Sequence, residues 1–254
     1  MDVLVAIFRF PFYSIAKRSY QVRASLVLPS PSALKGALAK GISLLTERNG
    51  DKLDDIAKEI IKELESKLVY VSAKPYRSAI VKNPILLKRL RNLEPYKSKP
   101  KTQDEWEKYF TKDDAMRREY TFARELLAIY VFKELSEEEK ELFLKAVYLI
   151  DQLGDTESVG CVVKAGWFKL KSEKSPLKLY TELDKLRSEN IIGEFIVEGM
   201  LKSPSFGGKI EERPYLIPLV ERHYKRTTYY VETEDSLEGN YKLEAFDEVM
   251  GLWI

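Results

Sequence analysis

The chain has 254 residues, a hydrophobic content of 44% and a formal net charge of +2, which suits one elaborated core or two small ones. Its single cysteine, Cys161, excludes an intrachain disulfide, and one cysteine with one histidine, His223, excludes a conventional structural zinc site. No stretch reaches the roughly 18 uncharged apolar residues of a membrane span, and the first residues lack the pattern of a signal peptide. We therefore expect a cytoplasmic protein.

The charges are sorted along the sequence. Residues 3–46 and residues 66–93 contain no aspartate or glutamate, yet they carry six and seven lysines and arginines, so the rest of the chain sums to −11. By proportion, about seven acids would be expected in the first window alone. This sorting predicts a polyanion-binding face, although a solvated surface that lacks acids would give the same pattern. Interleaved tyrosines that could stack on unpaired bases are Tyr13, Tyr20, Tyr70 and Tyr76. DNA, RNA and an acidic protein partner all stay open at this point.

The first elements follow from local patterns. Asp2–Phe10 is apolar and β-branched, which predicts a strand. Ser30 as N-cap and Pro31 in the first turn predict a helix to about Leu45, which Asn49-Gly50 separates from a second amphipathic helix. A further strand is expected at residues 68–73. The apolar helix faces are Leu34, Leu38, Ile42 and Leu45 in the first helix, and Leu53, Ile56, Ala57, Ile60 and Leu64 in the second.

The middle of the chain is less regular. Residues 74–101 contain four prolines and nine basic residues against one acid, which predicts a basic excursion rather than a core element. Thr102 and Glu105 form a capping box for a short helix. Residues 119–132 fit either a strand or a helix.

The last third of the chain begins with another capping box, Ser136 with Glu139, which predicts a helix closed by Gly154. A strand is expected at residues 159–170, a helix from Ser175-Pro176 to about Arg187, and a β-rich region from Ile191 onward. The resulting order of strands and helices is that of the split βαβ, ferredoxin-like arrangement.

Few residues carry recognisable chemistry. The helix start at Ser30-Pro31-Ser32, with Lys35 one turn on, predicts an anion site, but an ordinary cap explains it as well. His223 lies in a basic, aromatic stretch where it could act in metal-independent RNA cleavage, or it could be a surface histidine. Asp155 and Glu157 could bind a metal or shape a turn. Gly207-Gly208 could admit a nucleic acid or form a plain turn. The sequence has no P-loop, metalloprotease or nucleophile-elbow motif.

Taken together, the N-terminal strand, Lys17–Leu38 (KRSYQVRASLVLPSPSALKGAL) and Gly154–Val159 (GDTESV) resemble a known family. It is the CRISPR-associated repair-associated-mysterious-protein (RAMP) group, and the match is best to its Cas-five type of the archaeal type I-A branch. The most telling piece is SPSALKGALAKGI. The resemblance implies an α+β fold: a ferredoxin-like (RRM-like) domain at 1–172 with a basic thumb inserted at about 74–118, and a β-rich C-terminal region at 173–254.

The resemblance also implies a function. Such a subunit holds the 5′ handle of the CRISPR RNA (crRNA), caps the backbone filament of the Cascade surveillance complex, and contacts its backbone and large subunits. It needs no cofactor, metal or small-molecule substrate and is not an enzyme. Lysine and glutamate enrichment with few glutamines is typical of thermophile proteins. The implied RNA-binding residues are Arg9, Lys17, Arg18, Tyr20, Arg23, Ser32, Lys35, Lys74, Arg77, Lys82, Lys88, Arg89 and Arg91.

Two alternatives stay open. One branch of the family, type I-C, cuts precursor RNA with a tyrosine, a lysine and a histidine, but this chain has no histidine in the corresponding thumb-side region. An endoribonuclease would have to use His223. The third possibility is an adaptor that binds acidic proteins.

Overall fold

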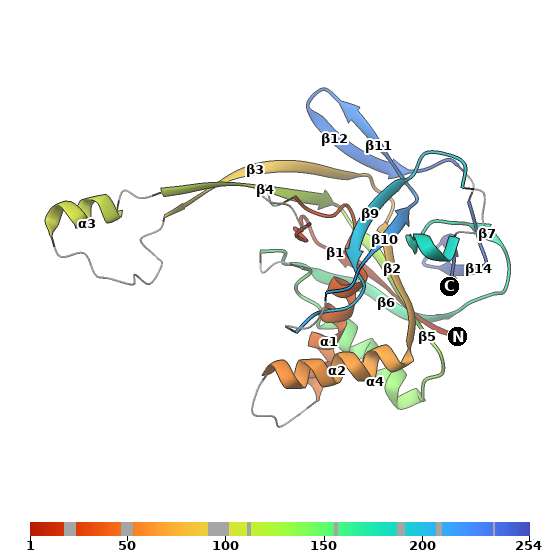
Figure 1. Ribbon diagram of the computed structural model, residues 1–254. Helices are drawn as coiled ribbons and strands as arrows, with labels where there is room; N and C mark the ends of the chain where they lie inside the picture. The colour runs from red at the N-terminus through yellow and green to blue at the C-terminus, as the bar shows by residue number, and fades with distance from the viewer. Residues whose placement is uncertain are drawn as a thin grey trace.

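The computed structural model describes residues 1–17, 24–46, 53–90, 102–110, 113–154, 157–186, 191–206, 210–235 and 237–254; for 53–54, 86–90, 108–110 and 113–117 only the backbone is described. The predicted turn at Asn49-Gly50 lies outside these ranges. The protein mixes helices and sheets, with most of its elements in strands (Figure 1). None of the helices in the described ranges is both long enough and apolar enough to cross a membrane.

The main sheet has four antiparallel strands in the order β2-β5-β1-β6. They are β1 (Asp2–Arg9), β2 (Leu68–Pro75), β5 (Leu126–Phe132) and β6 (Cys161–Lys169). β1 is central and pairs with β5 from Asp2 opposite Phe132 to Phe8 opposite Leu126. The apolar run predicted as the first strand is therefore confirmed as the middle of the sheet, where both faces are covered.

Three helices cover one face of this sheet: α1 (Pro31–Leu45), α2 (Leu53–Lys67) and α4 (Glu137–Tyr148) (Figure 1). Leu4, Ala6 and Phe8 of β1 pack into the core on this side. Val3, Val5 and Ile7 point the other way, into a second cluster with the hairpin of β14 (Tyr241–Ala245) and β15 (Glu248–Leu252). Because successive strand residues face opposite sides, an uninterrupted apolar strand needs cover on both.

The predicted helix caps are confirmed. The Ser30 side chain accepts a hydrogen bond from the Ala33 amide, with Pro31 in the first turn of α1. Ser136 and Glu139 form the reciprocal capping box of α4. The Thr102–Glu105 pair caps α3 (Gln103–Phe110), with both hydrogen bonds present at 3.4 and 3.3 Å.

The basic excursion is more regular than predicted. β3 (Ile80–Leu90) and β4 (Asp113–Ala123) form a hairpin of eleven residue pairs, which projects from the body as an arm and leads to α3 (Figure 1). Pro84 is tolerated because β3 has a second neighbour only at Ile80–Lys82, so Pro84 needs no amide on that side. The ambiguous segment 119–132 contains the end of β4 and the whole of β5, and no helix.

The predicted helix from Ser175-Pro176 to Arg187 is wrong. Ser175–Pro176 is the short strand β7, which pairs with β13 (Glu238–Gly239), and the helical part is one 3-10 turn, Leu183–Leu186. Pairing with a distant strand overrides the local Ser-Pro signal. Two smaller predictions also fail: Leu45 is 40% exposed at the end of α1, and α4 ends at Tyr148, well before Gly154.

The region after Ile191 is β-rich, as expected. β8 (Thr181–Glu182), β10 (Glu212–Ile217) and β9 (Ile196–Leu201) form a three-stranded sheet. β11 (Leu219–Tyr224) and β12 (Thr227–Glu232) form a hairpin that pairs with β3, so the arm and this hairpin share a four-stranded sheet in the order β11-β12-β3-β4. Residues from either side of the predicted 172/173 boundary share the main core, including Phe8, Leu34, Tyr180 and Tyr215. That division of domains stays a prediction.

Candidate nucleic-acid interface

The base of the arm is locked to the segment that precedes α1. Glu119 of β4 accepts a hydrogen bond from the Ser25 amide at 2.9 Å and forms an ion pair with Lys82 of β3 at 2.8 Å. Tyr13 and Thr121 exchange backbone hydrogen bonds at 2.8 Å in both directions. The arm therefore leaves the body in a fixed direction relative to the start of α1.

A second carboxylate holds the same segment from the opposite side. Glu198 of β9 accepts from the Val27 amide at 2.9 Å and pairs with Lys17 at 3.0 Å. Its own side chain is almost fully buried. Glu119 and Glu198 had no place in the sequence-based site. The sequence indicates them only indirectly. A basic segment without acids of its own must take its ion-pair partners from elsewhere in the chain, but the sequence does not say from where.

Arg118 and Glu157 make a third connection. The Arg118 guanidinium donates to Ser14 Oγ at 3.2 Å and to Glu157 at 3.1 Å, and Glu157 also accepts from the Tyr120 hydroxyl. Burial, followed by this hydrogen bond, raises the pKa of Tyr120. Glu157 thus ties the turn after α4 to the arm. Asp155 lies outside the described ranges, and the parts of the chain that are described hold no group of three metal-ligating side chains.

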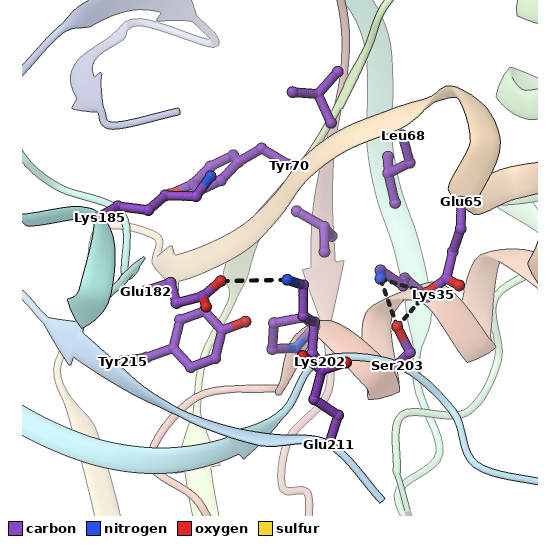
Figure 2. A pocket seen from close by; sticks show the side chains of 13 residues that line it. Lys35, Glu65, Leu68, Tyr70, Glu182, Lys185, Lys202, Ser203, Glu211 and Tyr215 are labelled. Atoms are coloured by element: carbon purple, nitrogen blue, oxygen red, sulfur yellow. Dashed lines mark hydrogen bonds and ion pairs between the residues drawn. The ribbon is translucent and has the colours of Figure 1, made fainter. Parts of the chain in front are cut away.

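A pocket of about 360 Å³ opens beside the N-terminus of α1 (Figure 2). Lys35 is buried there, and its ammonium lies 2.6 Å from Glu65 and 3.1 Å from Ser203 Oγ. The edge of β2 forms one wall. The other charged and aromatic side chains that line the pocket are Glu182, Lys185, Lys202, Glu211 and Tyr215.

Most charges around this pocket are matched. Lys202 lies 3.6 Å from Glu182, and Glu211 binds Arg213 outside the lining at 2.8 Å. Of the three lysines that line the pocket, Lys35 and Lys202 form ion pairs, and Lys185 forms none with the described residues. Burial lowers the pKa of Lys185, and nearby Lys202 adds to this while Glu182 opposes it. The lining holds three lysines, Lys35, Lys185 and Lys202, and three glutamates, Glu65, Glu182 and Glu211, so its formal charges balance.

Several predicted RNA-binding residues have their charges matched within the chain. Lys74 is buried against Glu232 at 2.6 Å and against Glu248. Lys82 and Lys35 are paired as described, and Arg9 holds Glu125 at 2.5 Å. In this structure the ion pairs of these residues connect elements of the protein to one another.

The other predicted RNA-binding residues are exposed or half-buried, or their side chains lie outside the described part of the chain. Arg77 is exposed, 3.5 Å from Asp247, with its guanidinium 5.0 Å from the Tyr76 ring centre. Ser32 is half-buried in the first turn of α1. For Lys88 and Arg89 only the β3 backbone is described. Arg18, Tyr20, Arg23 and Arg91 lie outside the described ranges, as do Gly207-Gly208.

His223 lies on the exposed hairpin β11–β12. Its Nε2 is 3.1 Å from Glu221 and its Nδ1 is 3.2 Å from Thr228 Oγ1, and both neighbours come from the same hairpin. The side chain is 66% exposed. None of the five main pockets formed by the described residues is lined by His223.

Comparison with known proteins places the chain in a family. No family model matches it. It is 61% identical over 255 residues to the CRISPR-associated protein Cas5 of Methanocaldococcus jannaschii, a match that covers 100% of this chain and 99% of that one. The chain belongs to the Cas5 family. This confirms the resemblance read from Lys17–Leu38 and Gly154–Val159.

One solved structure supports the fold. A CRISPR protein from Archaeoglobus fulgidus superposes with a TM-score of 0.50 at 18% identity, over 98% of this chain and 97% of that chain. A chain of a CRISPR RNA-guided surveillance complex matches at a TM-score of 0.44 and 12% identity, over 91% of this chain and 90% of its own, which is too distant to support an argument. The Cas5 chain described here is thus a mixed helix-and-sheet protein with a structural relative among CRISPR proteins.

Proposed function

We propose that this Cas5 protein is a non-catalytic crRNA-binding subunit of a type I (I-A) Cascade complex. It holds the 5′ handle of the crRNA, caps the backbone filament, and contacts the backbone and large subunits in the cytoplasm. The observation that carries the proposal is the arm, since its basic strand β3 projects from the body and two carboxylates, Glu119 and Glu157, tie its base to the segment before α1 and to the turn after α4 (Figure 1). The main sheet order β2-β5-β1-β6 supports the ferredoxin-like assignment, with the arm as the inserted thumb.

The chemistry of the interface suits RNA. Exposed basic side chains supply attraction to phosphates, while the buried pairs of Lys35, Lys74 and Lys82 supply rigidity. An arm whose base is fixed to the body also lowers the entropy lost when the strand is captured.

The test is binding of the isolated protein to crRNA with and without its repeat-derived 5′ handle. We expect tight binding to the first and little to the second. Affinity should fall with salt, with a log–log slope of roughly −0.7 for each phosphate contacted. Equal affinity for both RNAs would rule out handle recognition.

The same samples test cleavage. We expect the crRNA precursor to stay intact after long incubation in chelator, and His223→Ala to change nothing. Cleavage that disappears in His223→Ala would instead support the endoribonuclease. Absence of any RNA shift at moderate salt would favour the adaptor for acidic proteins.

A further inference from the structure

The sheet formed by β11, β12, β3 and β4 carries a row of side chains across all four strands. Phe122 pairs with Val81, Val81 with Tyr229, and Tyr229 with Arg222. Directly opposite residues of antiparallel strands point to the same face. We call this side of the sheet, with Tyr224 two residues beyond Arg222, the aromatic face.

The row is accessible to a ligand. Phe122, Val81 and Tyr229 are half-buried, Arg222 is exposed, and Tyr224 is 64% exposed at the end of β11. Phe12 extends the row, because its ring centre lies 6.2 Å from that of Phe122. The hairpin β11–β12 itself projects from the body near the base of the arm (Figure 1).

Charge is sorted between the two faces of this sheet. Among strand residues 80–85, 118–123, 219–224 and 227–232, the acids Glu119, Glu221 and Glu232 all fall on the face opposite the aromatic one. The aromatic face carries no acid in these ranges and two arginines, of which Arg118 is buried and paired with Glu157 at 3.1 Å. Arg222 is held by Glu194 at 2.7 Å, which comes from outside the sheet.

The turn at the end of the hairpin adds positive charge. Lys225 and Arg226 form it, and both are exposed. Lys225 has a positive φ of 55°, and its ammonium lies 5.3 Å from the Tyr224 ring centre. Neither residue forms an ion pair with another residue of the described part of the chain. A row of aromatic and apolar side chains that ends in cations is complementary to bases that run into phosphates.

The dimensions fit as well. Neighbouring strands lie about 4.8 Å apart, so the row from Phe122 to Arg222 spans roughly 14 Å. Sheets with exposed aromatics of this extent stack two or three unpaired bases. An apolar protein partner would gain less from this surface, because the cations at its end would find no counterpart.

We propose that the aromatic face binds two or three unpaired bases of a single-stranded nucleic acid, with Tyr229 as the central stacking residue and Lys225 and Arg226 on the following phosphates. The proposal rests on RNA binding by the chain and adds a surface that the base of the arm shares with the hairpin β11–β12, separate from the pocket beside α1. We assign the handle RNA to this face, and binding of any other single strand is an outcome that the experiment would reveal.

The test compares Tyr229→Leu, which removes the ring, with Tyr229→Phe, which keeps it. The probes are crRNA with its handle, a 12-residue oligouridine and the matching oligodeoxythymidine. We expect Tyr229→Leu to weaken binding about 5- to 100-fold, since a stacked base contributes roughly 1–3 kcal/mol, and Tyr229→Phe to stay within about twofold of wild type. The salt slope should not change in Tyr229→Leu, because no phosphate contact is lost.

The three probes assign the source of the strand. A loss on the handle crRNA places the handle on this face, a loss on both oligomers assigns any single strand, and a loss on oligouridine alone assigns RNA. If Tyr229→Leu does not fold, Tyr224→Ala at the exposed end of the row takes its place, with an expected loss of about 3- to 10-fold. Wild-type affinity of the folded variant for all three probes would overturn the aromatic face while leaving handle binding intact. Failure of the wild type to bind any RNA would overturn both proposals.

Discussion

Lys74→Met is expected to lower the free energy of unfolding by about 3 kcal/mol, because it removes one partner of a buried ion pair. Lys74 is almost fully buried and reaches both Glu232 and Glu248. Glu232 keeps an ion pair with Lys178 at 3.0 Å, whereas Lys74 is the one ion-pair partner of Glu248 among the described residues. The cost therefore comes mainly from the Glu248 carboxylate, which loses its partner at a side-chain exposure of 15%.

Urea unfolding measures this effect, and the chain offers a matched control. The pair of Lys171 and Glu244 lies 2.9 Å apart on the surface, so Lys171→Met should cost under about 1 kcal/mol. The double variant Lys74→Met/Glu248→Gln should recover part of the loss. A cost for Lys74→Met as small as that of the control would mean that Lys74 is not a structural residue and that its charge is free for RNA.

The same network sets a pH dependence. Burial alone would raise the pKa of Glu232, but Lys74 and Lys178 hold it below its usual 4.5. A carboxyl group with a depressed pKa stabilises the fold above the unfolded-state pKa, and that stability is lost as the pH falls through the folded-state value. We therefore expect stability to drop below about pH 4.5, and Lys74→Met to reduce this pH dependence in urea titrations between pH 6 and pH 3.

Gly41→Ala is expected to destabilise the protein by about 3 kcal/mol, since α1 and α4 cross at this residue. A Cβ at Gly41 would overlap the carbonyl oxygen of Ala146 and lie 2.8 Å from its carbonyl carbon. Backbone atoms cannot move aside as a side chain can, so the two helices would have to separate. Their packing covers one face of the main sheet.

Gly36→Ala is the matched control in the same helix. The nearest atom to its Cβ would be Pro204 Cγ at 4.0 Å, so alanine meets open space there and should add about 0.5–1 kcal/mol of stability. Thermal or urea unfolding of the two variants should therefore shift in opposite directions. Equal stability of Gly41→Ala and Gly36→Ala would contradict the close crossing.

Local patterns identified the elements whose signals lie within one turn or one strand. Ser30, Thr102 and Ser136 cap helices because side-chain oxygens close to the first amides accept their hydrogen bonds. The strand β1 could be predicted from its apolar run, because both faces of a central strand are buried and every position favours an apolar residue. Ser175-Pro176 misled for the converse reason, since its backbone pairs with residues about 60 positions away.

The sequence predicts only part of the candidate interface. The sequence shows where basic residues gather, but it cannot show that Lys35, Lys74 and Lys82 are neutralised by Glu65, Glu232 and Glu119. It also cannot bring Phe122, Val81 and Tyr229 into one row, because that row depends on the pairing of three strands.

By itself, then, the sequence determined the helix starts, the central strand, the sorted charge and the family resemblance, all of which depend on neighbouring residues or on motif order. The tertiary structure decided which cations stay exposed and which are matched, how the arm leaves the body, and that β11–β12 joins it in one sheet. The physical reason is that ion pairing and strand register join residues far apart in the chain, where no local pattern records the partner.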